Sequence, residues 1–338
     1  MPDGEPIVVV APDSFKGTFT AREVADAVGA GLRAGGIDQV VVCPVADGGD
    51  GTLDALAGPV GAELHQTRVR DPLGREIEAV FGLRPDGRIA IVEVARAIGL
   101  GLVDAADRDP EAASSAGVGD LILAARDAGA VEVVVGLGGS ATTDGGAGAI
   151  AAIRAAGGLG GVRLVLLCDV TTPFERAAAV FGPQKGADPP AVRRLTDRLD
   201  QLASSLPRDP RGLPMTGAAG GLSGGLWAAF GAELVSGGSF VLDRVGFDRL
   251  VAGATGVVTG EGRLDDQTAA GKVVAEVAGR GRRAGVPVHA VVGCDALGPD
   301  GSRRVGLSSV REAGTLGALR AAGVDLAADI VTRRVDLG

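Results

Sequence analysis

Short runs of β-branched and other apolar residues recur along the chain, separated by amphipathic stretches with a helical period. Seven runs have the length and composition of buried strands: 7–11, 40–45, 89–94, 131–137, 162–168, 257–259 and 286–292. Strands that alternate with helices usually pair in parallel, in a sheet that is covered on both faces. The pattern therefore predicts an α/β fold.

Four amphipathic stretches have the period of helices: 20–34, 118–128, 191–206 and 273–284. The first carries the clearest start signal, because Thr20 stands at the N-cap and Glu23 follows at capping-box spacing. Val24, Val28 and Leu32 fall on one face of this predicted helix. We expect that face to pack against a sheet.

Residues 63–98 follow a different pattern, with strand-like pieces joined by turn signals. The turns are Asp-Pro-Leu-Gly at 71–74 and Pro-Asp-Gly at 85–87, which predict antiparallel hairpins. A second subdomain is therefore expected to begin near residue 60. We predict a discontinuous first domain, residues 1–60 with 245–338, and an inserted second α/β domain, residues 61–244.

Composition and charge limit the classes of molecule that the protein is expected to bind. The net charge of −9 argues against binding nucleic acid over a broad surface, and aromatic residues make up only 3% of the chain, with no tyrosine. No apolar run is long enough to span a membrane. An acidic protein that binds anions must therefore do so locally, with backbone amides and a few well-placed cations.

Cysteine and histidine are sparse. The three cysteines form no CxxC pair, and the first residues carry no basic leader, so we expect reduced thiols and a cytoplasmic location. With only two histidines, a histidine-based metal site or a Ser-His-Asp triad is not expected. His289 lies in an apolar run and is predicted to be a core residue.

Glycine stands beside Asp, Lys, Ser or Thr in five segments where a strand is predicted to end or a helix to begin. These segments are 11–17, 46–52, 136–146, 168–170 with 181–186, and 259–272. In open α/β sheets, ligands bind beyond the carboxyl ends of the strands. The five loops are therefore the expected site.

All three lysines of the chain, among 33 basic residues, lie next to glycine inside these loops: Lys16, Lys185 and Lys272. A lysine ammonium reaches a phosphate as a compact point charge, and arginine does not replace it isosterically. Carboxylates in the same loops suit phosphoryl transfer, which needs ligands for Mg²⁺ and a group that receives a hydroxyl proton. The candidates are Asp13, Asp47, Asp144, Asp169, Glu261 and Asp265.

Two partial motifs point elsewhere. Gly136-x-Gly138-x-x-Ala141 follows a predicted strand, as in a dinucleotide fingerprint, but the next strand-ending acid, Asp169, lies farther away than the usual ~20 residues. Gly271-Lys272 is not a P-loop, because Asp266 occupies the first glycine position and Val273 the last. Neither motif alone identifies a function.

Taken in order, the motifs resemble those of the bacterial glycerate kinase family. They are APDSFKG at 11–17, ADGGDGT at 46–52, GLGGSATTDGGAG at 136–148, CDV at 168–170, FGPQKGA at 181–187, GAAGGLSGGL at 217–226 and TGEGRLDDQT at 259–268, followed by GK. The resemblance implies ATP-dependent, Mg²⁺-assisted phosphorylation of D-glycerate, giving 2-phosphoglycerate or 3-phosphoglycerate. It also implies two α/β domains, one of them Rossmann-like, with the active site in the interdomain cleft.

On the basis of this resemblance we expect the following roles for the loops. Residues 136–146 are expected to wrap nucleotide phosphates, while Lys16 and Lys185 neutralise the transferring phosphoryl group or hold the carboxylate of glycerate. Asp47 or Asp169 would accept the hydroxyl proton, and Glu261 or Asp265 would bind Mg²⁺. The remaining candidates for substrate or nucleotide binding are Asp13, Ser14, Gly48, Gly49, Gly138, Gly139, Ser140, Thr142, Asp144, Gln184, Gly260 and Lys272.

Two alternatives remain open. One is an NAD(P)-dependent oxidoreductase that uses the loop from Gly136 to Ala141. The other is a catalytically inactive relative that binds a small acid, because the bridge at 150–162 is shorter than is usual in the family. The sequence allows either a monomer or a homodimer.

Overall fold

The computed structural model describes residues 5–269 and 272–336, and these form two compact units. Unit 1 comprises Met1–Asp47 and Gly238–Gly338, and unit 2 comprises Gly48–Gly237. The first boundary therefore lies before helix α2 (Thr52–Val60), which packs against strands of unit 2, whereas the sequence division was placed after residue 60. The second boundary lies a few residues before the predicted one.

Unit 1 contains the parallel sheet that the sequence predicted. Its strand order is β11 (Ser309–Glu312), β10 (Val288–Val292), β9 (Gly256–Gly260), β1 (Ile7–Pro12) and β2 (Gln39–Val42), and all four pairings are parallel. The three central strands are almost entirely buried, which explains why they are continuous apolar runs in the sequence.

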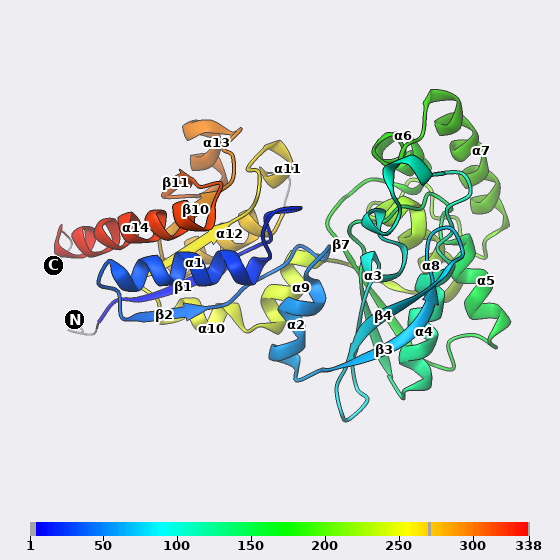
Figure 1. Ribbon diagram of the computed structural model, residues 1–338, viewed down its shortest axis with the longest axis horizontal. Helices are drawn as coiled ribbons and strands as arrows, with labels where there is room; N and C mark the ends of the chain where they lie inside the picture. The colour runs from blue at the N-terminus through cyan, green and yellow to red at the C-terminus, as the bar shows by residue number, and fades with distance from the viewer. Residues whose placement is uncertain (1–4, 270–271, 337–338) are drawn as a thin grey trace. The chain divides into compact units, whose positions relative to one another are not determined.

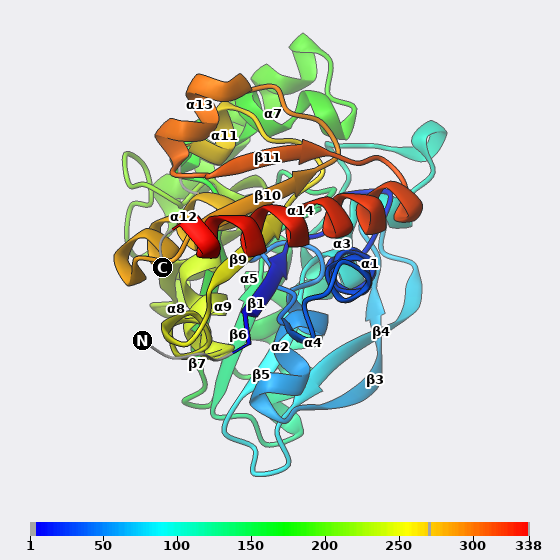
Figure 2. The same cartoon turned by 90° about the vertical axis from the view of Figure 1, so that its left-hand side faces the viewer.

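Helices cover both faces of this sheet (Figures 1 and 2). On one face, α1 (Ala21–Ala34) and α14 (Leu316–Asp336) pack together over Val8, Val10 and Val258. On the opposite face, α12 (Val273–Ala284) packs against β9 and β10 and against α10 (Phe247–Ala252). The other helices of this part of the chain are α9 (Gly237–Arg244), α11 (Asp266–Ala269) and α13 (Gly298–Val305).

The predicted start of α1 is confirmed. The Thr20 hydroxyl accepts a hydrogen bond from the Glu23 amide, and the Glu23 carboxylate accepts one from the Thr20 amide, which completes a capping box. Val24, Val28 and Leu32 are buried toward the sheet, as the apolar spacing predicted.

Unit 2 is built on a mixed sheet, as expected from the hairpin pattern. Its strand order is β3 (Glu63–Arg70), β4 (Glu76–Leu83), β5 (Ala90–Glu93), β6 (Glu132–Gly136), β7 (Arg163–Cys168) and β8 (Glu233–Ser236). The β3–β4 and β4–β5 pairs are antiparallel and the others are parallel. Both predicted turns lie between antiparallel strands.

The main core of unit 2 lies between one face of this sheet and three helices, α4 (Ala116–Asp127), α5 (Ala147–Ala155) and α8 (Leu222–Phe230). On the other face, Leu53 of α2 reaches Gly82 of β4. A smaller apolar cluster joins Phe174 to α6 (Ala177–Phe181) and α7 (Pro189–Ser205). Short helical turns complete the unit: α3 (Ala95–Ile98) and 3₁₀ turns at Leu100–Leu102, Ala105–Asp107, Phe174–Arg176, Pro183–Lys185 and Ala218–Gly221.

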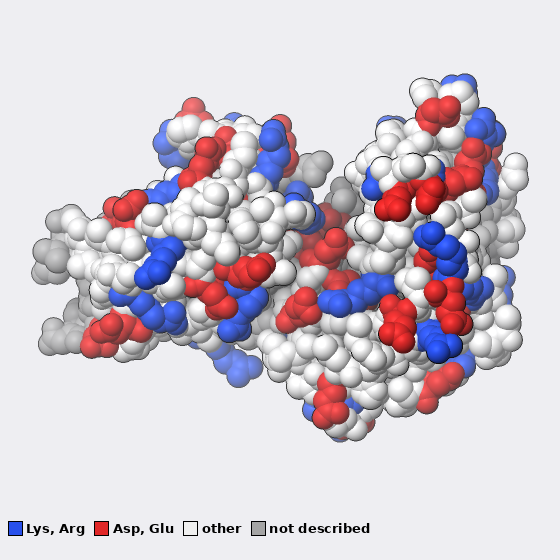
Figure 3. Space-filling view, in the orientation of Figure 1, with Lys and Arg blue, Asp and Glu red and all other residues white. Residues whose placement is uncertain are grey.

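On the face in Figure 3, basic and acidic side chains occur in small mixed groups and form no continuous basic surface. Within residues 5–269 and 272–336, no helix has the length and apolarity needed to cross a membrane.

Candidate functional site

A hollow of about 1,050 Å³ opens in unit 1 beyond the carboxyl ends of the parallel strands. Five of its lining residues follow β1, five follow β9, two follow β10 and one follows β11. They are Asp13, Ser14, Phe15, Lys16 and Thr18, then Glu261, Gly262, Arg263, Asp265 and Lys272, then Gly293 and Cys294, and finally Gly314. Loops that are far apart in the sequence therefore meet at one edge of one sheet.

Lys16 forms an ion pair with Asp47 across this edge, with 3.0 Å between Nζ and Oδ2. The Asp47 side chain is buried, at 3% exposure, whereas that of Lys16 is 55% exposed. The ammonium is thus anchored by a buried carboxylate and still faces open space. Lys16 is therefore a partly exposed cation that lines the pocket.

Asp13 is a second buried carboxylate beside this pair. Burial and the neighbouring charge of Asp47 raise its pKa well above the ordinary value, and Lys16 opposes this shift. The Ser14 amide donates a 2.6 Å hydrogen bond to Asp13 Oδ1. A carboxylate whose pKa is raised in a ligand pocket is suited to accepting a proton.

Glu261 adds a third acid on the β9 side. The Thr268 hydroxyl donates to its Oε1 at 2.6 Å, and Lys272 Nζ lies 4.0 Å from its Oε2. Burial raises the pKa of Glu261, and the charges of Asp265 and Asp47 raise it further. Lys16 and Lys272 therefore line the same pocket as Asp13 and Glu261.

This donor set fits a divalent cation that is shared with a phosphate. Among the described residues, no group of three or more His, Cys, Asp or Glu side chains is arranged to hold a metal by itself. Mg²⁺ in phosphoryl-transfer sites commonly uses only one or two carboxylates, with phosphate oxygens and waters as further ligands. The mutual repulsion of Glu261, Asp265 and Asp47 would be relieved by such an ion.

The glycine-rich loops of unit 2 pack against each other. A Cβ atom added to Gly138 would lie 2.4 Å from Gly49 Cα, and one added to Gly136 would lie 3.0 Å from the Gly48 carbonyl oxygen. The Leu137 amide donates to that same carbonyl. The close approach of the two loops therefore favours glycine at positions 136 and 138. This packing role differs from the phosphate-wrapping role expected for residues 136–146.

We predict that Gly138→Ala lowers the free energy of unfolding by about 2 kcal/mol, because the new methyl group overlaps backbone atoms. Gly58→Ala is the matched control in the same unit: it lies within α2 with no atom within 4 Å of its added Cβ, and it should be neutral or stabilising. Chemical denaturation of both variants measures the difference. Equal stability of the two variants would contradict the packing role of Gly138.

Asp144 also has internal partners. Its carboxylate accepts hydrogen bonds from the Ser115 amide and hydroxyl and from the amides of Gly146 and Gly148. These bonds join the beginnings of α4 and α5. Asp144 thus braces unit 2, and its predicted contact with a ligand remains a prediction.

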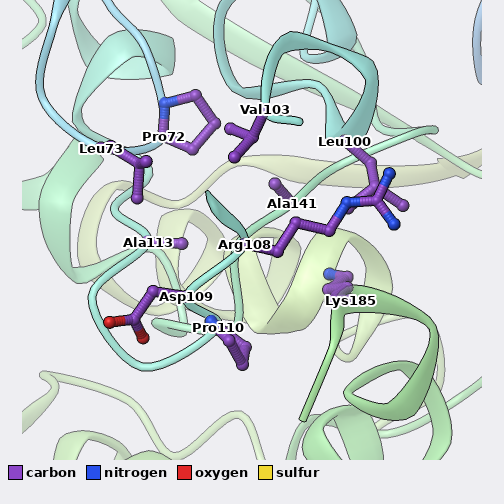
Figure 4. Close-up of a pocket in the computed structure, with 10 residues that line it drawn as sticks. All are labelled: Pro72, Leu73, Leu100, Val103, Arg108, Asp109, Pro110, Ala113, Ala141 and Lys185. Atoms are coloured by element: carbon purple, nitrogen blue, oxygen red, sulfur yellow. The ribbon is translucent and has the colours of Figure 1, made fainter. Parts of the chain in front are cut away.

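Lys185 lies in unit 2 and is almost fully buried, at 3% exposure. Its Nζ donates to Ser140 Oγ at 3.0 Å and to the Thr142 carbonyl oxygen at 2.5 Å. Burial lowers the pKa of Lys185 to about 7, while the charge of Asp144 acts in the opposite direction. Figure 4 shows Lys185 at the edge of a small pocket of unit 2, whereas Lys16 and Lys272 line the pocket of unit 1.

The predicted site residues thus divide between the units. Asp13, Ser14, Lys16, Asp47, Gly260, Glu261, Asp265 and Lys272 belong to unit 1, whereas Gly48, Gly49, Gly138, Gly139, Ser140, Thr142, Asp144, Asp169, Gln184 and Lys185 belong to unit 2. Asp169 directly follows β7, and Gln184 is exposed beside Lys185. Gly271 lies outside the described residues. The predicted cleft between domains remains a prediction.

Three polar residues of these loops were missed by the sequence analysis. Glu93, at the end of β5, accepts hydrogen bonds from the amides of Gly51 and Thr52 and so caps α2. The sequence did contain a signal for Glu93, because it is an acidic residue near the end of a predicted strand. Arg108 and Arg263 line the two pockets. Arg263 lies inside the motif at 259–268, whereas nothing distinguishes Arg108 in the sequence from the many other arginines.

The dinucleotide alternative receives little support from the geometry of unit 2. Helix α5 begins at Ala147, six residues beyond Ala141, whereas the fingerprint places its last small residue at the opening of the helix. The Ala141 and Gly145 amides donate to the carbonyls of Ile98 and Gly220. They are therefore not available to a pyrophosphate.

Comparisons with known proteins agree with the site. The model of the glycerate kinase family matches residues 8–158 and 154–318, in two pieces that overlap at 154–158, where α5 ends. Glycerate 2-kinase of Escherichia coli K12 is 39% identical over 323 residues, covering 85% of this chain and 84% of that protein. Glycerate kinase of Bacillus subtilis 168 is 38% identical over 326 residues, covering 85% of this chain and 84% of that protein.

Structural similarity extends over nearly the whole chain. The crystal structure of a protein described as "putative glycerate kinase 2", from Salmonella typhimurium LT2, superposes with a TM-score of 0.82 at 34% identity. The superposition covers 98% of this chain and 100% of that chain. By sequence and by structure, the chain belongs to the glycerate kinase family.

Proposed function

We propose that this enzyme transfers the γ-phosphoryl group of ATP to D-glycerate, with Mg²⁺, and that the product is 2-phosphoglycerate. The observation that carries the proposal is the pocket of unit 1, where Lys16 and Lys272 face Asp13 and Glu261 at the carboxyl edge of a parallel sheet. The choice of the 2-hydroxyl is supported by the name of the Escherichia coli relative, a glycerate 2-kinase. Soluble substrates of this kind fit a cytoplasmic enzyme.

Phosphoryl transfer spreads negative charge over the equatorial oxygens of the moving group, so catalysis depends on positioned positive charge. Lys16 is suited to this task because Asp47 fixes the direction of an ammonium that is still half exposed. Lys272, only 19% exposed and within 4.0 Å of Glu261, supplies a second cation in the same pocket. We assign both lysines to the transferring phosphate.

The glycerate hydroxyl must lose a proton as its oxygen attacks phosphorus. Asp13 is our choice for the proton acceptor, in place of the sequence candidates Asp47 and Asp169, because Asp47 is already paired with Lys16. The raised pKa of Asp13 makes it a stronger base than an ordinary aspartate once it is ionised. Glu261 and Asp265 are the residues that would hold Mg²⁺, which when bound offsets charge on the phosphates.

A coupled assay with D-glycerate and Mg-ATP tests the proposal, with the product identified by ³¹P NMR. We expect ADP and 2-phosphoglycerate in equal amounts, and loss of turnover when EDTA removes Mg²⁺. Incubation with glycerate and NAD is the control and should produce no NADH. Formation of 3-phosphoglycerate would correct the position of transfer.

The inactive-relative alternative predicts a different outcome in the same assay. The α5–β7 connection, where the two family matches meet, is short and contains several glycines with positive φ. A chain that binds glycerate but forms no phosphorylated product would support this alternative and contradict the proposed kinase activity.

A further inference from the structure

Lys16 lies on a three-residue turn, Lys16-Gly17-Thr18, that follows β1 and precedes α1. The Phe15 amide donates a 2.8 Å hydrogen bond to the Phe19 carbonyl oxygen, and the Phe15 carbonyl oxygen accepts bonds from the amides of Thr18 and Phe19, at 2.7 and 3.1 Å. Phe15 and Phe19 therefore pair as the two sides of a small antiparallel hairpin. Gly17, at the tip, has a φ of +79°, which glycine adopts without strain. The backbone that carries Lys16 is thus closed by hydrogen bonds, although all three turn residues are exposed.

Two phenylalanine rings join this turn to the core of unit 1. Phe15 is buried in the apolar cluster that β1, α1 and α14 share, and Phe19 is partly buried against the same cluster. The two ring centroids are 6.4 Å apart and the ring planes are inclined at 53°, a tilted arrangement that aromatic pairs favour. The turn is therefore held by side-chain packing as well as by its backbone hydrogen bonds.

Both ends of the turn are tied to regular elements of unit 1. Phe19 directly precedes Thr20, the N-cap of α1, and Val24 lies four residues beyond the cap in the same apolar cluster. An apolar pair at these two positions fixes the angle at which a chain enters a helix. At the other end, the Asp13 amide donates a 2.8 Å hydrogen bond to the carbonyl oxygen of Gly260, the last residue of β9. The turn therefore joins a sheet to a capped helix.

The ion pair with Asp47 does not by itself determine where the Lys16 ammonium lies. The Lys16 side chain is 55% exposed, and an ion pair that is open to water contributes little free energy. Lysine also has a flexible four-carbon stem, so its ammonium reaches many positions from one Cα atom. Because a fixed backbone reduces that number, the residues that hold the turn also decide how often Lys16 meets Asp47.

We propose that Phe19 is a positioning residue for this enzyme: its ring fixes the turn that carries Lys16 and so keeps the Lys16 ammonium beside Asp47 in the pocket of unit 1. The described residues that line this pocket include Phe15 and Thr18 but not Phe19, so Phe19 acts through Lys16. The part of Lys16 in phosphoryl transfer rests on the proposed function. The placement of its ammonium by Phe19 does not.

Phe19→Ala removes the ring and leaves the backbone hydrogen bonds of the turn in place. We expect kcat to fall about 10-fold, while KM for D-glycerate changes less than about twofold, because a displaced ammonium weakens stabilisation of the transition state more than binding of the substrate. Phe19→Leu, which keeps apolar bulk against the cluster, should recover most of the loss. Val40→Ala is the matched control, since Val40 of β2 is also partly buried against this cluster and lies outside the turn. It should lower Tm without changing kcat.

The position of Lys16 can also be followed without turnover, because the chain contains only three lysines. Protein labelled with ¹³C at lysine Cε gives one NMR signal for each lysine, and Lys16→Met identifies the signal of Lys16. In Phe19→Ala we expect this signal to move toward the shift and line width of free lysine, while those of Lys185 and Lys272 stay in place. Val40→Ala should leave all three signals unchanged.

The pH profile gives a further readout that a loss of stability alone would not alter. Among the charges that act on Asp13, those of Asp47 and Glu261 raise its pKa and that of Lys16 lowers it. A displaced Lys16 ammonium should therefore let the pKa of Asp13 rise. The acid limb of the kcat/KM profile should shift to higher pH in Phe19→Ala and stay in place in Val40→Ala.

The NMR and kinetic results separate this inference from the proposed function. A Lys16 signal in Phe19→Ala that matches the signal of the unaltered protein would overturn the inference, even if Tm falls. A displaced Lys16 signal with unchanged kcat would support the placement of Lys16 by Phe19 and contradict the catalytic role assigned to Lys16.

Discussion

Replacing Lys16 with methionine is expected to lower kcat by about 10²- to 10³-fold. Methionine keeps most of the aliphatic length of lysine but removes the ammonium that we assign to the transferring phosphoryl group. The loss should appear mainly in kcat, because the charge that Lys16 stabilises grows during the transfer. Steady-state kinetics with D-glycerate and Mg-ATP measures the change.

The surroundings of Lys16 sharpen this prediction. Asp47 is buried and paired with it, so Lys16→Met leaves that carboxylate without its cation. Lys16 also opposes the rise in the pKa of Asp13, and its removal should move the pKa of Asp13 still higher. The acid limb of the kcat/KM profile should therefore shift to higher pH in this variant.

Arg22→Met is a suitable control for Lys16→Met, because Arg22 is an exposed cation a few residues along the chain that pairs with exposed Asp26. Its kcat should match that of the unaltered enzyme. Lys16→Arg should restore little activity, since a guanidinium does not fit the position of an ammonium. A kcat for Lys16→Met within threefold of the unaltered value would remove Lys16 from the mechanism.

Local sequence signals predicted much of the fold because they act over few residues. The Thr20–Glu23 capping box and the two hairpin turns depend on side chains that lie next to each other in the sequence. The strands β8 and β11 were missed because each has four residues at the edge of its sheet and no fully buried run. Their pairing depends on neighbours that are distant in sequence.

The site was harder to predict, because the same residue types serve packing and chemistry. The motif around Gly138 resembles a phosphate loop, yet the glycine is required by the approach of Gly49. Lys16 and Lys272 line one pocket, whereas Lys185 lines another in the other unit, a division that lysine spacing does not reveal.

Asp13→Asn should lower kcat by about 10²- to 10⁴-fold if Asp13 receives the hydroxyl proton. The amide has the same shape and can still accept the bond from the Ser14 amide, but it cannot take up a proton in this pH range. In the unaltered enzyme, kcat/KM should fall as the pH decreases through the raised pKa of Asp13. The kcat/KM of Asp13→Asn should not show this decrease at low pH.

Asp13→Asn should also raise the free energy of unfolding at neutral pH. Burial and Asp47 raise the pKa of Asp13 in the folded state, so the native protein binds more protons than the unfolded chain between the two pKa values. The contribution of Asp13 to stability therefore decreases as the pH rises through this interval, and above it ionised Asp13 destabilises the fold. Asparagine removes that cost and should raise Tm.

A higher Tm together with a much lower kcat is difficult to explain by damage to the fold, and it is typical of a residue retained for catalysis at the expense of stability. Asp38→Asn, an exposed change in unit 1, is the control and should alter neither quantity. If Asp13→Asn raises Tm but leaves kcat unchanged, the ionised Asp13 carboxylate does destabilise the fold, but Asp13 is not the group that accepts the hydroxyl proton. Asp47 and Asp169 would then be the acids to test, in that order, because Asp47 shares the pocket edge with Lys16.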